Sequence, residues 1–598
     1  MRLSNSLSSF NKQKGAALVV FFMAIILAGA VFLISNSGSD NGQVNGQNKT
    51  TASLAKAKSA IISYAVSYYL TTSDGNHGFL PCPETSKSSS DGRSVLNCAI
   101  GGSRHVNKLG RLPWKTLQIP ALTDSAGECL WYAMSGSFSP SPRALMLNDD
   151  TPGMFQIHSE NSNLYEGLTP EDRVVAVVIA PGAPLGNQSR TNAASGLPCK
   201  VPHDQVTASN YLDSIQNINN ATISDVNPDI VDKFINSIGV LDNQNINDRM
   251  ITITSKEIFD AIKKNNLTYT NKIKLLGEAL GDCLISYANS TAIKNAIATN
   301  PNFCPNFDSC ISSCDDAFNL CTANKPTGQA NALCHQSLTS CSKTCGANCG
   351  NGGGNNGNNG NNGNNGNNGN NGNNGNNGNN GNNGNNGNNG NNGNNGNNGN
   401  NGNNNGSLTY RLPWPALVNL ANDYRINNSY IDQPTTNSYL GRLPYSTVNS
   451  SAAILGATDT DIFTTCKLNT NNIELFNLWN NWKDHWFYVL GRAYAPDALP
   501  NTVCNTCPTL NGQAANAAIL IFSGERLNNQ LRRTNETEDP DPIFANSKGF
   551  IGNYLEGSNF SNYPDSTGGG DYGTAGINST DRYFCIPEDM TAVTECSP

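Results

Sequence analysis

Cysteines and histidines are the residues of this 598-residue chain whose types and spacing could do chemistry. Cys504-Asn505-Thr506-Cys507 has the CxxC spacing of redox-active and zinc-binding sites. A thioredoxin-like CxxC opens a helix directly after a strand, whereas here loop-forming residues 500–502 precede the motif and Pro508 follows it. Zinc would need two further ligands, and the chain has no second CxxC. We therefore expect ordinary structural disulfides here, with Cys466 as a further candidate for the pairing.

Other catalytic patterns are missing from the sequence. None of the six histidines belongs to an HExxH motif or has a second histidine at ligand spacing, and the chain has neither a GxSxG elbow nor a Walker loop. Two acidic stretches, Asp225–Asp232 and Glu536–Asp541, lack the regular spacing of calcium loops, so we expect solvated loops there. The sequence therefore predicts no metal, no cofactor and no enzymatic activity.

A second group of cysteines is more regular. Eight lie between residues 304 and 349, and from Cys310 onward they are separated by 4, 7, 13, 7 and 4 residues, which is a palindrome. Steps of four and seven keep side chains on one face of a helix, so two antiparallel helices would face each other across a turn. The expected pairs are Cys310–Cys345, Cys314–Cys341, Cys321–Cys334 and Cys304–Cys349.

The segment after this hairpin, residues 350–406, is composed almost entirely of Asn-Asn-Gly repeats. Glycine at every third position superficially matches collagen, but no proline is present to stiffen a triple helix. We expect a flexible, solvated linker that tethers the hairpin.

The net charge and the distribution of cysteines indicate the class of partner and the cellular compartment of the protein. The chain has 37 Lys+Arg against 45 Asp+Glu, a net charge of -8, so we expect no nucleic-acid partner. All 18 cysteines follow residue 81, after the long apolar segment near the N-terminus. An even number of cysteines distributed in this way predicts a disulfide framework in an oxidising compartment such as a bacterial periplasm.

The N-terminus contains a basic polar stretch followed by an uncharged apolar run, Ala16–Ile34. Its length suits a membrane-spanning helix, and the positive charge before it predicts a cytoplasmic N-terminus. A cleaved secretory signal is one alternative, because Ala28-Gly29-Ala30 has the small-x-small form, although Val31–Ile34 prolongs the apolar run past it. An uncleaved signal anchor is another.

A third interpretation rests on Lys12-Gln13-Lys14-Gly15-Ala16, a basic leader that ends in glycine directly before the apolar run. This stretch resembles the leader of type IV prepilins and type II secretion pseudopilins. The resemblance implies cleavage by a prepilin peptidase between Gly15 and Ala16, followed by methylation of Ala16. Family members usually have Phe and Glu where this chain has Ala16 and Val20, and some minor and tip subunits also lack that Glu. The chain is therefore similar to a minor or tip subunit.

The rest of the chain contains two sets of landmarks in the same order. Ile62–Ala65 recurs as Ile285–Ala288, and Gly110–Trp114 recurs as Gly441–Tyr445. Three further pairs follow in the same order. Trp131-Tyr132 corresponds to Phe487-Tyr488, and Asn210–Leu212 corresponds to Asn553–Leu555. Between them, the strand 174–180 with Gln188 and Arg190 corresponds to the strand 517–522 with Gln530 and Arg532. Five ordered landmarks predict two related modules.

The predicted organisation is a leader (1–15), a transmembrane helix (16–35), a linker (36–50), a first module (51–270) and a second module (273–598). The second module would contain the cysteine hairpin (304–349) and the repeat linker (350–406). Within each module a helix precedes the strands, which is an α+β arrangement of helix plus antiparallel sheet similar to a pilin head. We expect a buried Trp114 behind the turn at Pro113.

The function predicted from this resemblance is structural: a minor pilin or pseudopilin-like subunit of an extracytoplasmic filament, possessing an adhesive role if it lies at the tip. Its expected partners are the prepilin peptidase, other pilin or pseudopilin subunits and the bacterial inner membrane, with the bulk of the chain in the periplasm or on the cell surface. The alternative is a membrane-anchored surface adhesin that never enters a filament.

Overall fold

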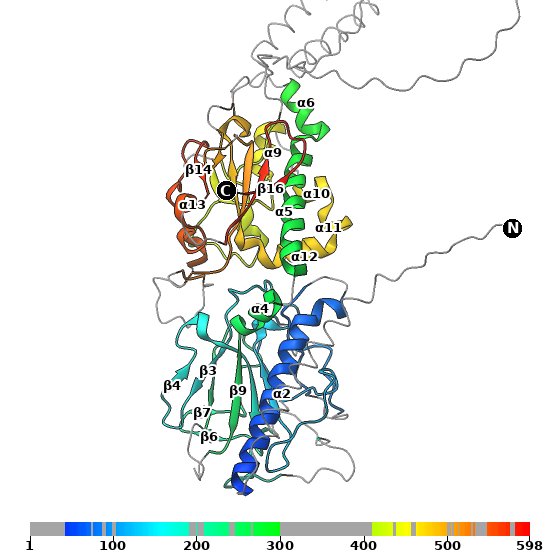
Figure 1. Cartoon of the computed structure of the whole chain (residues 1–598), viewed down its shortest axis with the longest axis vertical. Helices are drawn as coiled ribbons and strands as arrows, with labels where there is room; N and C mark the ends of the chain where they lie inside the picture. The colour runs from blue at the N-terminus through cyan, green and yellow to red at the C-terminus, as the bar shows by residue number, and fades with distance from the viewer. Residues whose placement is uncertain are drawn as a thin grey trace, which may run out of the picture.

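The computed structural model describes residues 42–597 with gaps at 73–75, 86–90, 99–102, 191–198, 200–207, 238–245, 265–266, 300–409, 435–437, 456–461, 499–503, 505–506, 514, 528–529, 533–546 and 574–579. Figure 1 shows these residues as two halves placed end to end, the first half ending with α4 and the second half beginning with α5. The predicted leader, transmembrane segment, cysteine hairpin and repeat linker lie outside the described residues.

The first half (residues 42–264) begins with a long helix and continues with strands. Its elements are α2 (Gly42–Thr71), β1 (Lys108–Arg111), β2 (Trp131–Met134), β3 (Phe155–His158), β4 (Leu164–Glu166), β5 (Val174–Ala180), β6 (Ser214–Ile215), β7 (Ile218–Asn219), β8 (Asp232–Ile235), β9 (Arg249–Thr254) and α4 (Ser255–Lys264). The second half (residues 267–597) repeats this order of helix and strands.

The elements of the second half are α5 (Leu267–Ala288), α6 (Thr291–Thr299), β10 (Leu440–Arg442), α9 (Val448–Leu455), α10 (Ile462–Cys466), α11 (Leu468–Asn471), α12 (Ile473–Trp482), β11 (Trp486–Leu490), β12 (Thr509–Leu510), β13 (Ala518–Phe522), α13 (Gly557–Ser561), β14 (Asp571–Tyr572), β15 (Arg582–Ile586) and β16 (Thr594–Cys596). Helices α9 to α12 lie between β10 and β11, where the first half has only loops between β1 and β2.

Helix α2 packs along the sheet of the first half, against β5 and β9. Its buried residues follow a helical period of three and four: Leu54, Ala57, Ile61, Ala65 and Tyr68. The helix begins at Gly42, earlier than the sequence predicts. The Thr50 hydroxyl donates to the Gly46 carbonyl oxygen (3.3 Å) and accepts from the Ser125 amide (3.0 Å), so a contact with the first half offsets the weak helix propensity of this stretch.

Strand β5 is the central strand of the first sheet, and every one of its residues is buried. It pairs antiparallel with β2 and β9, and its two faces belong to different core clusters. Val175 and Val178 face the α2 side, whereas Val177 and Ile179 face the cluster around Trp131. The continuous run of branched apolar residues is the pattern expected for a strand covered on both faces.

The second sheet has the order β10-β11-β13-β15-β16 and is antiparallel throughout. Helix α5 packs across it, and two of its glycines permit a close approach. A Cβ atom at Gly277 would lie 2.3 Å from the Phe584 ring, and one at Gly281 would lie 2.4 Å from Val593. Because glycine has no side chain, Gly277 and Gly281 allow α5 to lie close to the sheet.

The fold class predicted from the sequence is wrong about the direction of some strands. The chain is α+β, but the first sheet is mixed, because β8 pairs parallel with β3 from Phe155↔Asp232 to His158↔Ile235. Strands β12 and β14 also pair in parallel. A tight hairpin forces neighbouring strands to be antiparallel, but more than fifty residues separate β5 from β8, so the returning chain can run in the same direction as β3.

The predicted fold class is also corrected on membrane spanning. Across the described residues, no helix combines the length and the apolar composition needed to cross a bilayer. Helix α2 is long, with 30 residues, but it carries Lys49, Lys56 and Lys58 and buries only one face. The described fold therefore has no transmembrane helix, and residues 16–35, for which one is predicted, lie outside it.

Candidate functional site

The predicted processing residues Gly15 and Ala16 lie outside the described residues, as do the eight cysteines of the predicted hairpin. The ten described cysteines form five disulfides: Cys82–Cys98, Cys129–Cys199, Cys283–Cys466, Cys504–Cys507 and Cys585–Cys596. The CxxC motif therefore forms a disulfide, and Cys466 ties α10 to α5. Five disulfides are consistent with an extracytoplasmic location.

A buried arginine is the chief feature of the repeated Gly-Arg-Leu-Pro stretch. The guanidinium of Arg111 lies 4.3 Å from the ring centres of both Trp131 and Tyr211, and that of Arg442 lies 4.1 Å from Phe487 and 4.2 Å from Tyr554. Burial lowers the pKa of Arg111 to about 10. These stacked cations hold the sheet against the loop that follows its central strand.

The aromatic residue that ends each stretch has a smaller role than the sequence predicts. Trp114 is only half-buried, with its indole over Gly92. A positive φ of 79° and the nearby indole leave no room for a side chain at Gly92. The arginine, not the tryptophan, is therefore the central group of this stretch.

In each half, a second arginine donates hydrogen bonds to backbone carbonyl oxygens at corresponding positions. Arg190 donates to the carbonyl oxygens of Gly182 (2.6 Å) and Asn210 (3.0 Å). Arg532 donates to those of Gly524 (3.1 Å) and Asn553 (2.6 Å). Each arginine also donates to the glutamine two residues earlier, Gln188 or Gln530. The two halves therefore use corresponding residues for the same contacts.

Arg532 differs from Arg190 in one contact that crosses between the halves. Its Nη1 lies 3.2 Å from Oδ2 of Asp150, and both side chains are almost completely buried, at 0% and 2% exposed. The imidazole Nε2 of His485 lies 3.0 Å from the same carboxylate. Burial alone would raise the pKa of Asp150, but the Arg532 guanidinium reverses this effect and holds the pKa far below its usual value.

A neighbouring carboxylate, Asp484, completes the network at this junction. It accepts from Lys548 Nζ (2.5 Å), Tyr554 Oη (2.9 Å) and Asn148 Nδ2 (2.8 Å). Burial opposes its ionisation, but Lys548 and the other cations keep the pKa of Asp484 lowered. The same Asn148 amide group donates to the Asn481 carbonyl oxygen (2.9 Å), so one side chain of the first half bonds two residues of the second.

Asp149, Asp150 and His485 are the one group of potential metal ligands in the described part of the chain, with ligand atoms within 4.8 Å of one another. Their surroundings argue against a cation. Lys263 Nζ lies 2.8 Å from Asp149, and Arg532 and Arg526 lie 3.2 Å and 3.9 Å from Asp150. Because these cations already balance the carboxylates, a divalent ion would meet repulsion. The cluster does not fit a metal centre.

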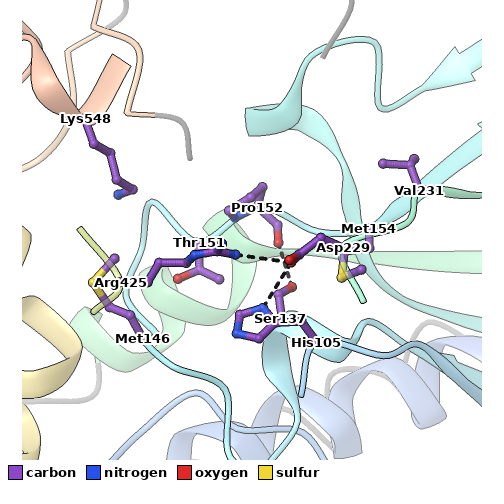
Figure 2. A pocket seen from close by; sticks show the side chains of 10 residues that line it. All are labelled: His105, Ser137, Met146, Thr151, Pro152, Met154, Asp229, Val231, Arg425 and Lys548. Atoms are coloured by element: carbon purple, nitrogen blue, oxygen red, sulfur yellow. Dashed lines mark hydrogen bonds and ion pairs between the residues drawn. The ribbon is translucent and has the colours of Figure 1, made fainter. Parts of the chain in front are cut away.

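Figure 2 shows a second polar group at the junction, lining a cavity of about 20 Å³, which is room for roughly one water molecule. Ser137, His105 and Asp229 line it together, the residue types of a hydrolytic triad. However, His105 Nε2 accepts from the Leu145 amide (3.2 Å), and the Ser137 hydroxyl donates to the Pro152 carbonyl oxygen (2.7 Å). The serine therefore has no base to activate it.

The remaining bonds of this group are structural. His105 Nδ1 lies 3.4 Å from Asp229, and Arg425 of the second half lies 3.2 Å from the same carboxylate. Asp229 and Arg425 thus form a second ion pair across the junction. We conclude that the polar groups at the junction hold the two halves together.

The junction is not predicted from the sequence above, although one signal for it exists. Lys483, Asp484 and His485 are the three residues between Trp482 and Trp486, and all three are buried. A run of charges between aromatic residues indicates buried ion pairs. A further repeat, Leu80–Pro83 and Leu412–Pro415, lies within the two halves instead, where its last prolines pack against Gly110 and Gly441.

No protein-family model, curated protein or solved structure matches the chain. The resemblance to pilins therefore rests on the residues of the leader and on the order of helix and strands.

Proposed function

We propose that the protein is a structural subunit of an extracytoplasmic filament of the type IV pilus or type II secretion kind, as a minor pilin or pseudopilin-like protein. The observation that carries the proposal is the packing of α2 on β5 and β9, at the start of the described chain. A leading helix laid along a sheet is the arrangement that the resemblance to pilin heads implies. The proposed role needs no catalytic step.

The junction between the halves supports a mechanical role. Asp150–Arg532 and Asp229–Arg425 bridge it, and Phe259 of α4 contacts the Trp482 ring at 5.9 Å. Buried ion pairs demand fixed geometry, because a charge that leaves its partner remains desolvated and unpaired. A chain built in this way would hold its second half at a fixed position relative to its first half.

The proposal is tested at the N-terminus, with the prepilin peptidase as the expected processing partner. The mass of the N-terminal peptide of the purified protein is measured from cells with and without active peptidase. A chain that begins at methylated Ala16 only when the peptidase is active supports the proposal. An intact Met1 in both strains overturns it.

A second candidate function is a surface-binding protein that never enters a filament. An open cleft of about 190 Å³, lined by Arg143 and Asn477 among others, would give such a protein a place for a ligand. Co-purification with other pilin or pseudopilin subunits separates the two candidates, since only a filament subunit makes stable contacts with them.

A further inference from the structure

Two buried acidic residues, Asp213 and Asp248, lie together where the loop after β5 meets β9. Asp213 directly precedes β6, and Asp248 directly precedes β9. The Asp213 amide donates to Oδ2 of Asp248 (2.8 Å), and the Asp248 amide donates to Oδ2 of Asp213 (3.0 Å). The exposed fractions of the two residues are 4% and 0%. The reciprocal bonds therefore hold two carboxyl groups in one site that is shielded from solvent.

The two carboxyl groups have different hydrogen-bond donors. Asp213 also accepts from the Asn247 amide (2.7 Å) and from Gln188 Nε2 (2.9 Å). Oδ2 of Asp248 also accepts from Asn220 Nδ2 (2.8 Å), but within the described residues its Oδ1 has no hydrogen-bond partner. An ionised oxygen without a donor is costly in a buried site, whereas a protonated carboxyl group carries no charge. These contacts suit an ionised Asp213 and a protonated Asp248.

The charges around this pair also favour one retained proton. Among the described residues, the cation that attracts both carboxyl groups is Arg190, and its Nη1 lies 3.3 Å from the Glu128 carboxylate as well. Asp124 accepts from a backbone amide of the same loop (2.8 Å), which adds a further acid. Burial first, and the Asp213 charge second, raise the pKa of Asp248 well above its usual value. Two acids this close titrate as a unit, and the loss of one proton makes the other harder to remove.

The second half repeats this pair of acids as Glu556 and Asp581. Asp581 directly precedes β15, as its counterpart precedes β9, and accepts from Asn559 Nδ2 (3.0 Å). Glu556 accepts from Gln530 Nε2 (2.7 Å). Both acids are half-buried, and the cation that faces them, Arg532, is also engaged at the junction. Two acids, an asparagine and a glutamine thus recur at corresponding positions, which is independent support for a common role.

We propose that Asp213 and Asp248 share one proton in the folded protein, and that loss of this proton in alkaline solution releases the segment 208–222 from β9. The proton passes to solvent hydroxide, and the two carboxylates, both negative, then repel each other. Because the closed site binds a proton that the open site releases, the segment is held at neutral pH and loosens as the pH rises. The inference does not depend on filament entry, because it concerns the first half alone.

The test is amide hydrogen exchange of the full-length protein at about pH 6 and about pH 9, corrected for the intrinsic pH dependence of exchange. In the wild type, exchange in segment 208–222 should become faster by about tenfold or more, the factor that corresponds to one pK unit. In Asp248→Asn it should stay slow at both pH values, because the side-chain amide has the shape of the protonated acid and cannot ionise. A wild-type segment that does not accelerate, or a variant that accelerates equally, would overturn the proposal.

A second measurement detects the proton itself. Infrared difference spectra over the same pH range should show loss of a protonated carboxyl band, and the loss should be smaller in Asp248→Asn than in the wild type. Asp581→Asn is the matched control, because burial also raises the pKa of Asp581, to about 7. It should reduce the same band but leave exchange in segment 208–222 as in the wild type. An undiminished band in Asp248→Asn, or slowed exchange of the segment in Asp581→Asn, would contradict a proton held by the first pair.

Discussion

Asp150 and Arg532 are 382 residues apart in the sequence, and their side chains meet at 3.2 Å in the buried junction between the halves. Arg532 of the second half corresponds to Arg190 of the first half. Among the described residues, Arg190 has no such partner across the junction and instead lies 3.3 Å from Glu128 of its own half. One copy of a repeated arginine thus supports only its own loop, whereas the other also joins the two halves.

Replacing one member of this pair should destabilise the protein strongly. We expect Asp150→Ala to lower the free energy of unfolding by roughly 3–5 kcal/mol, because Arg532 would remain buried without its counter-charge. Urea unfolding followed by tryptophan fluorescence measures the change. Asp260→Ala, which removes an exposed pair with Lys256, is the control and should cost less than about 1 kcal/mol. Equal effects for the two variants would show that the junction pair is not buried in solution.

The junction should also weaken in acid. The pKa values of Asp150 and Asp484 are lowered in the folded state, so their contribution is complete above the unfolded pKa of about 3.9 and is lost as pH falls below it. We expect the urea midpoint to fall steeply below about pH 4. In Asp484→Asn this acid dependence should be smaller. An unchanged dependence would mean that other carboxylates govern acid unfolding.

Glu84 should give a pH dependence of the opposite sign. Burial raises its pKa to about 7, against about 4.3 in the unfolded chain, so the folded state holds a proton that the unfolded state releases. The free energy of unfolding should therefore fall as pH rises from about 4.3 to 7. Glu84→Gln should reduce this fall without abolishing it, because the pKa of Asp581 is also raised to about 7. If the variant keeps the full slope from pH 4.5 to 7.5, Glu84 is ionised throughout.

The disulfides should differ in their effect on stability. Cys283–Cys466 joins residues 183 apart, whereas Cys504–Cys507 joins residues 3 apart. Closing a longer loop restricts the unfolded chain more, so replacing both cysteines of the first pair by serine should cost roughly 2–5 kcal/mol, and replacing the CxxC pair less than about 2 kcal/mol. Thermal unfolding of the two double variants measures the difference. The reverse order would indicate that the CxxC bridge has a special role.

Arg111 and Arg442 should be irreplaceable by lysine. A lysine keeps the charge but cannot stack a planar guanidinium on the rings of Trp131 or Phe487. We expect Arg111→Lys and Arg442→Lys each to cost at least about 2 kcal/mol in urea unfolding. Arg93→Lys at the surface should be neutral. A large effect in one half only would argue that the two stretches are not equivalent.

Several elements follow from the sequence alone, because local patterns determine them. The apolar run of residues 174–180 matches β5, and the spacing of Leu54, Ala57 and Ile61 gives the buried face of α2. The repeated landmarks align in the structure as well: Gly110 pairs with Tyr132, and Gly441 pairs with Tyr488. Periodicity and repetition are properties of the chain itself, so they can be read without coordinates.

Only the tertiary structure decided the strand direction of β8, the pairing of Cys283 with Cys466 and the ion pair of Asp150 with Arg532. Each joins segments distant in the sequence, and many alternative pairings would satisfy the same local patterns. The choice among them depends on which surfaces are buried together, since a buried charge is tolerated only where its partner arrives from elsewhere in the fold.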